Sequence, residues 1–229
     1  MALTRVQAAP KASGTNLVMT FTTPPAVGSA VVVAAVCWGG ALPSTCTDNR
    51  GHTYTLVTTA SNSNPRLGIW FCERVTTTGT PFTVTATTSG GYGTAIEVGG
   101  LPVGGTIAVD QFVTATGSSA TPSSGLTPAL TNADAFGVLV LSMNASLSSL
   151  VVDAVTPVWT QDLEDLTFGL ATGEVDSRAL TGGAGVQQSG GWTANASANW
   201  VAALAVFGAV AAPPPAGVEH AFAFIGVPV

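Results

Sequence analysis

Short segments of alternating or wholly apolar residues, separated by turn residues, make up most of the chain. Ala30–Trp38 and Phe136–Met143 are apolar at nearly every position, which is typical of central strands covered on both faces. Phe82–Ala86 alternates with threonine, which predicts a strand with one face open to water. No segment keeps a helical period beyond about two turns. The pattern therefore predicts an all-β protein.

The remaining segments support the same architecture. Leu67, Ile69 and Phe71 would share one strand face. The turn Asp48–Gly51 has residues that bond their own backbone or accept a positive φ. Many short strands between such turns predict a sandwich or barrel, and we expect a two-sheet antiparallel β-sandwich of jelly-roll or immunoglobulin-like type. The other expected strands are Thr15–Thr22, Tyr54–Thr59, Ala95–Val98, Ile107–Val113, Val151–Val155, Val158–Gln161, Leu170–Arg178 and Trp200–Phe207.

The chain is expected to form one domain followed by an extended tail. A polar loop, Gly117–Ser124, roughly halves the chain, but each half has too few predicted strands for its own core. Residues 1–210 are therefore assigned to one sandwich domain. Residues 211–229 form a proline-rich hinge and a further alternating segment, and a proline linker acts as a semi-rigid spacer. We expect the tail to bind a partner through its apolar residues, which are Phe222, Phe224, Ile225 and Val227.

Composition narrows the classes of function. The chain has 229 residues, of which only 18 are charged, with a net charge of -6, while 32 threonines and 17 serines supply most of the polarity. A net negative charge opposes binding to nucleic acid, and a content of 46% hydrophobic residues argues against disorder. Uncharged surface that a free monomer would expose points instead to assembly with other proteins.

Targeting signals are weak. The first residues lack the pattern of a secretory signal peptide. The apolar run Trp200–Ala212 is shorter than the roughly 18 residues that cross a bilayer, so no membrane partner is expected. Cys37, Cys46 and Cys72 are an odd number without zinc spacing. They are interpreted either as buried thiols or as one disulfide, Cys37 with Cys46 or with Cys72, beside one thiol.

The search for catalytic groups finds little. The two histidines, His52 and His220, are too few for a multi-histidine metal site, and a Ser-His-Asp triad would have to recruit His52 from a tight turn. A glycosidase needs only two carboxyl groups, and Glu73 and Glu97 lie on predicted strands. Either glutamate can equally pair with an arginine or face water. We therefore expect no catalytic residue, no metal, no cofactor and no enzyme activity.

Acidic residues concentrate in one region, and the tryptophans are spread out. Asp162, Glu164 and Asp165, with Glu174 and Asp176 near by, offer the oxygen ligands that calcium prefers. They lack a calcium-loop pattern, and a solvated edge that discourages strand pairing is the favoured interpretation. Of the five tryptophans, Trp159 and Trp192 lie in polar surroundings, where they could contact a glycan or pack in the core. Trp38, Trp70 and Trp200 are expected in the core.

Four stretches of the chain carry turn and core motifs, namely Thr23–Ser29, Thr47–Val57, Ile96–Leu101 and Trp200–Phe207. Together they resemble a β-sandwich module of tailed-phage virion proteins and bacterial surface proteins, over roughly residues 3 to 208. Because the shared features are turn and core motifs, the resemblance bears on the fold more than on function. It implies no catalytic residues.

The resemblance and the composition lead to one expected function and one alternative. The expected function is that of a phage virion structural protein, a capsid decoration or tail-attached accessory protein, assembled in the host cytoplasm. It would bind other virion proteins and form a homo-oligomer. The alternative is a carbohydrate-binding or adhesin module that recognises a host surface glycan.

Overall fold

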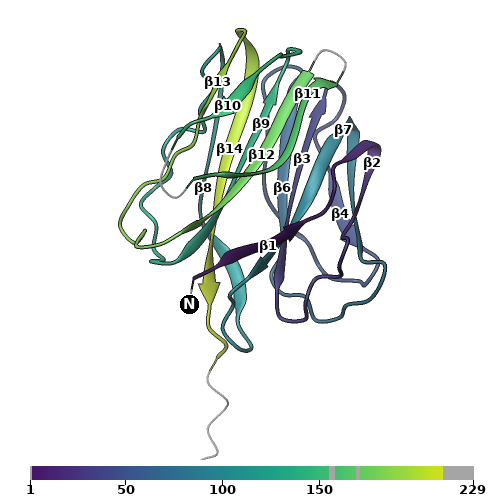
Figure 1. Ribbon diagram of the computed structural model, residues 1–229, viewed down its shortest axis with the longest axis vertical. Helices are drawn as coiled ribbons and strands as arrows, with labels where there is room; N and C mark the ends of the chain where they lie inside the picture. The colour runs from purple at the N-terminus through teal and green to yellow at the C-terminus, as the bar shows by residue number, and fades with distance from the viewer. Residues whose placement is uncertain (1, 155–157, 169–170, 214–229) are drawn as a thin grey trace, which may run out of the picture.

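The computed structural model describes residues 2–154, 158–168 and 171–213. Within them the chain is all-β, as expected, and most strands belong to two large antiparallel sheets that pack face to face (Figure 1). The strands are β1 (Thr4–Ala8), β2 (Ala12–Thr20), β3 (Ala30–Trp38), β4 (Thr45–Asp48), β5 (Thr55–Ser61), β6 (Pro65–Cys72), β7 (Thr83–Gly99), β8 (Thr106–Ser119), β9 (Ala135–Met143), β10 (Leu150–Val152), β11 (Thr160–Phe168), β12 (Ala171–Leu180), β13 (Trp192–Ala194) and β14 (Ala198–Val210).

Each half of the chain builds one sheet. The first sheet has the order β1-β7-β3-β6-β5, with β2 and β4 also paired to β7. The second has the order β11-β12-β9-β14-β8. The chain crosses between them at residues 100–105, directly after β7. The two-sheet antiparallel sandwich predicted from the pattern is confirmed. Each sheet covers the inner face of the other.

Three apolar layers hold the sandwich together. The middle layer lies between the sheets and includes Val32, Val138 and Val175. A second covers the outer face of the first sheet, and a third covers the outer face of the second sheet beneath β10 and β13. Central strands therefore bury both faces, which explains why β3 and β9 are apolar at almost every position.

β7 is one continuous strand where two were predicted. Its first part pairs with β2 and β4, and its second part pairs with β1 and β3. Gly90 and Gly91 lie where these partners change, and a side chain at Gly91 would collide with the Val36 carbonyl oxygen. Glycine here allows the neighbouring backbone to approach closely, so the glycine cluster continues the strand instead of ending it.

The polar stretch Gly117–Ser124 is also partly a strand. β8 extends to Ser119, well beyond the predicted end at Val113. Gly117, Ser118 and Ser119 are residue types common in loops, but here they extend a strand at the edge of the sheet. The prediction that this stretch is wholly a loop is therefore wrong for its first three residues.

Candidate functional site

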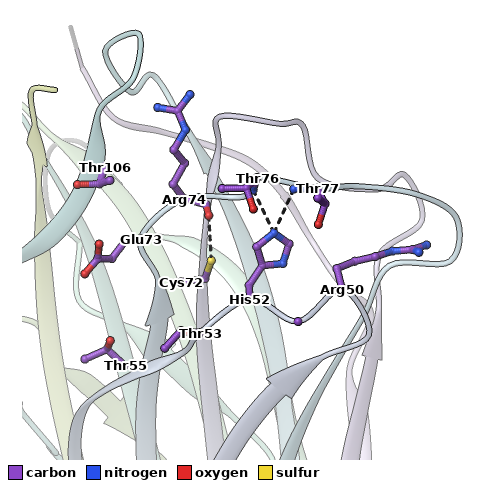
Figure 2. A pocket seen from close by; sticks show the side chains of 11 residues that line it. Arg50, His52, Thr53, Thr55, Cys72, Glu73, Arg74, Thr76, Thr77 and Thr106 are labelled. Carbon is purple, nitrogen blue, oxygen red and sulfur yellow. Dashed lines mark hydrogen bonds between the residues drawn. The ribbon is translucent and has the colours of Figure 1, made fainter. Parts of the chain in front are cut away.

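A cavity with a volume of about 580 Å³ lies at one end of the first sheet. It is formed by the Asp48–Tyr54 turn, the end of β6 and the loop that follows β6 (Figure 2). The lining of the cavity is rich in hydroxyl groups and includes three charged side chains. The lining residues are Arg50, Gly51, His52, Thr53, Thr55, Cys72, Glu73, Arg74, Thr76, Thr77 and Thr106.

His52 in this cavity is fully engaged by protein groups. Its Nδ1 lies 2.7 Å from Asp48 Oδ2, and its Nε2 lies 3.0 and 3.3 Å from the amide nitrogens of Thr76 and Thr77. Because both amides donate, Nε2 must accept, so Nδ1 carries the proton and donates it to Asp48. Nε2 thus has no free lone pair for a nucleophile, and the Asp48–His52 pair anchors the loop after β6 instead of activating a serine.

The two arginines that line the cavity also donate hydrogen bonds to backbone carbonyl groups. Arg50 Nη2 donates to Pro81 O at 3.0 Å, and Arg74 Nη1 donates to Gly105 O at 2.8 Å. Figure 2 shows both guanidinium groups turned away from the imidazole ring. Cys72 Sγ donates to Arg74 O. These contacts fix loops against strands, which is a structural use of the residues.

Glu73 and Glu97 do not form a carboxylate pair. Glu73 is exposed and lines the large cavity, whereas Glu97 is 2% exposed and lines a different one. Glu97 accepts hydrogen bonds from Gln7 Nε2 at 2.7 Å and from the Ala26 amide at 2.8 Å. The structure therefore separates the two glutamates and gives Glu97 a role in holding β1 and the Ala26 turn.

The three cysteines are buried free thiols, so of the two interpretations the thiol one is confirmed. Burial raises the pKa of Cys37 and of Cys46, and it raises that of Cys72 to about 11. Since the thiolate is the reactive form, none of these groups is prepared to act as a nucleophile.

Two of the acidic residues of β11 form ion pairs with residues from the first half of the chain. Asp162 has a fully buried side chain that is ion-paired with Arg5 Nε. Asp165 Oδ2 lies 2.7 Å from Lys11 Nζ. Because Arg5 and Lys11 belong to the first sheet's side of the sandwich, the two ion pairs fasten the β11 edge of the second sheet to the first. The solvated-edge prediction is wrong for Asp162, and it is also wrong for Glu174 and Asp176, which are buried.

Glu174 and Asp176 are buried as well, on the outer face of the second sheet. Gln161 Nε2 donates to Glu174 Oε1, and Trp192 Nε1 donates to Asp176 Oδ2, both at 3.2 Å. No described N–H or hydroxyl group donates to the remaining oxygens, Glu174 Oε2 and Asp176 Oδ1. Burial, and for Asp176 also the neighbouring Glu174, raises the pKa of both carboxyls. The two groups lie two residues apart on one face of β12, so ionisation of one opposes ionisation of the other, and the pair is expected to share a proton.

Trp159 and Trp192 pack in the layer that covers the second sheet. Trp159 is 7% exposed, and its ring lies 4.2 Å beneath the Arg178 guanidinium carbon. Trp192 is 1% exposed. The interpretation that these two residues pack in the core is therefore confirmed. Neither indole presents a face on which a sugar ring could stack. Trp70 and Trp200 are buried as predicted, and Trp38 is partly buried.

β8 forms the opposite edge of the second sheet and is open. Its backbone ladder is with β14 alone. Beyond this ladder, described segments bond its backbone at two places, where Ile107 N donates to Glu73 O and where Gly117 O accepts from Asn62 Nδ2. The side chains of Phe112, Thr114 and Thr116 lie on one face of β8 and are exposed to solvent. Phe112 is 46% exposed. Between these two places the outward backbone groups are available to another strand.

No group of three or more His, Cys, Asp or Glu side chains among the described residues is arranged to hold a metal ion. No helix of the described chain is long and apolar enough to cross a membrane. Comparison with protein-family models, with curated proteins and with solved structures finds no match to this chain.

The predicted tail contacts lie outside the described residues, and the most open edge was missed. Phe222, Phe224, Ile225 and Val227 belong to residues 214–229, on which the structure gives no description. The β8 edge was missed because the predicted strand ended at Val113. A usable signal was present, since threonine or serine occupies every second position from 114 to 118.

Proposed function

We propose that the protein is a phage virion structural protein, a capsid decoration or tail-attached accessory protein, that acts by binding protein partners. The observation that carries the binding role is the open β8 edge, which has no charged residue from Gln111 to Ser119. Soluble proteins normally protect such edges with charges, prolines, bulges or covering segments. An unprotected edge of this length favours a protein that works in an assembled state.

The placement of the chemical groups supports a binding role over catalysis. His52, Glu97 and Asp162 each use their polar atoms on neighbouring protein groups. Glu174 and Asp176 are buried on the same face of β12, beneath the layer that contains β13. Side chains held in this manner stabilise the sandwich, and each of these five makes its contacts with other protein groups.

The virion part of the proposal rests on the resemblance of the turn and core motifs to tailed-phage modules. The low charge of the chain is consistent with it, because assembly on a particle buries surface that a free monomer would expose. A homo-oligomer and other virion proteins are the proposed partners. Assembly of the particle would take place in the host cytoplasm.

The test is deletion of residues 211–229, followed by measurements of oligomeric state and of binding to purified particles. We expect the deletion to weaken both at least tenfold, because the tail is the proposed anchor. Full-length protein that fails to bind particles at micromolar concentration would refute the virion role. A saturable signal on a glycan array would favour the adhesin alternative, since a decoration protein is expected to give none.

A further inference from the structure

The two edges of the second sheet are built in opposite ways. The β11 edge carries Asp162, Glu164 and Asp165, has two register shifts and is tied to the first sheet by ion pairs. The β8 edge pairs in unbroken register with Ala198–Val206 from Gln111 onwards and lacks charge and proline. Only the β8 edge therefore offers a regular row of backbone donors and acceptors to an incoming strand.

β5, the neighbouring edge of the first sheet, is a poorer template. It has seven residues, and its register with β6 shifts between Leu56 and Thr58. A bulge interrupts the row of backbone groups and twists the strand. An added strand that needs a continuous ladder is therefore expected on β8, whose pairing with β14 has no register shift over the nine residues Gln111–Ser119.

We propose that residues 218–227 of a second copy of this chain add as a strand to the free edge of β8. The segment has ten residues with one carboxylate, Glu219, and Gln111–Ser119 has nine. At about 3.3 Å per residue, both span roughly 30 Å, so the lengths match. Main-chain hydrogen bonds would supply the affinity, as in other cases of strand addition.

The side chains fit this pairing. Phe112 and Thr114 lie opposite Ala205 and Ala203, two members of the middle layer, so they point toward the side of the first sheet. Phe112 is nevertheless 46% exposed there, because β8 is the last strand of its sheet. Phe222 and Phe224 share one face of an extended segment. On an added strand these two rings would cover Phe112 and extend the middle layer.

The position of the tail favours a second copy over the same chain. β14 ends beside the beginning of β8, where Val210 pairs with Thr106. To reach its own β8 edge, the chain would have to reverse within 213–217. This stretch contains three consecutive prolines, which favour an extended polyproline conformation. Such a sequence disfavours a tight reversal, so the edge of a second copy is the proposed acceptor.

This inference rests on the proposal that the protein acts by binding, but it does not depend on a particle. Two full-length variants separate the two halves of the contact. The edge variant, Thr114→Lys with Thr116→Lys, places charge on β8 and keeps the tail. The tail variant, Phe222→Asp with Phe224→Asp, keeps the edge.

The control, Thr15→Lys with Thr20→Lys, adds the same charge at exposed positions of β2 in the other sheet. Association is measured by sedimentation velocity from 1 to 100 µM, and circular dichroism checks that each variant is folded. A contact with a dissociation constant of roughly 10 µM would be half-formed within this range.

Wild-type and control proteins should associate with the same midpoint, and each test variant alone should associate at least tenfold more weakly. An equimolar mixture of the edge and tail variants should form a heterodimer that grows no further, because it contains one intact tail and one intact edge. A folded edge variant that associates like wild type would overturn the inference, and so would a mixture that stays monomeric. Association that follows this pattern without particle binding would sustain the inference and refute the virion role.

Discussion

The buried carboxyl pair Glu174 and Asp176 predicts an unusual dependence of stability on pH. Burial raises the pKa of both groups above their values in an unfolded chain, which are about 4.3 and 3.9. The folded protein therefore keeps a proton that the unfolded chain has released. The contribution of the pair is fully present at acid pH and is lost as pH rises toward the folded pKa values.

The size of the effect follows from the number of protons retained. One shared proton corresponds to a fall in the free energy of unfolding of about 1.4 kcal/mol per pH unit, starting near pH 5. Two neighbours act in the same direction, since the negative charge of Glu164 opposes ionisation of Glu174, and that of Asp162 opposes ionisation of Asp176. Most proteins are most stable between about pH 5 and 8, so a steady loss over this range would be diagnostic.

Urea unfolding at each pH from 5 to 9 measures the slope. The double variant Glu174→Gln with Asp176→Asn removes both carboxyls and keeps an acceptor for the indole of Trp192, so its slope should be close to zero. Glu73→Gln changes an exposed carboxyl and should keep the wild-type slope. If wild-type stability is flat or rises with pH, or if the double variant keeps the wild-type slope, the shared-proton account is wrong.

Three further predictions concern single contacts. Arg5→Met leaves the buried carboxylate of Asp162 without its ion partner and should cost about 2–4 kcal/mol in denaturant unfolding, while Arg5→Met with Asp162→Leu should recover most of it. His52→Ala removes the anchor of the loop after β6 and should cost about 2–3 kcal/mol; hydrogen exchange should accelerate in that loop, and a loop that stays protected would contradict the assigned bonds. Gly173→Ala places a Cβ 2.6 Å from Tyr92 Oη and should cost about 1–3 kcal/mol, and a double-mutant cycle with Tyr92→Phe should show partial rescue.

Hydrophobic periodicity in the sequence determined the architecture. Apolar residues at consecutive positions of β3 and β9 require cover on both faces, and this requirement predicts stacked layers without any knowledge of topology. Threonine alternation likewise identified the half-exposed start of β7. These features are local, because a strand's side chains point alternately to its two faces whatever the strand pairs with.

The burial of the polar residues of β12 depends on tertiary packing and could not be predicted from the sequence of the strand. Glu174, Asp176 and Arg178 alternate with Val175 and Ser177, a pattern typical of a solvated strand face, yet the layer that contains β13 covers that face. Nothing within β12 encodes this cover, since it comes from segments more than ten residues away in sequence.

The position of β8 at an open edge also follows from the tertiary structure. Strand order, not strand sequence, leaves β8 with a neighbour on one side and none on the other among the described strands. The position of a residue along a strand determines the face to which its side chain points. Whether that face, or the edge of the strand, contacts protein or water depends on pairing and packing between distant segments. For this reason the sequence predicted the sandwich, and only the folded structure located the edge on which the proposed assembly depends.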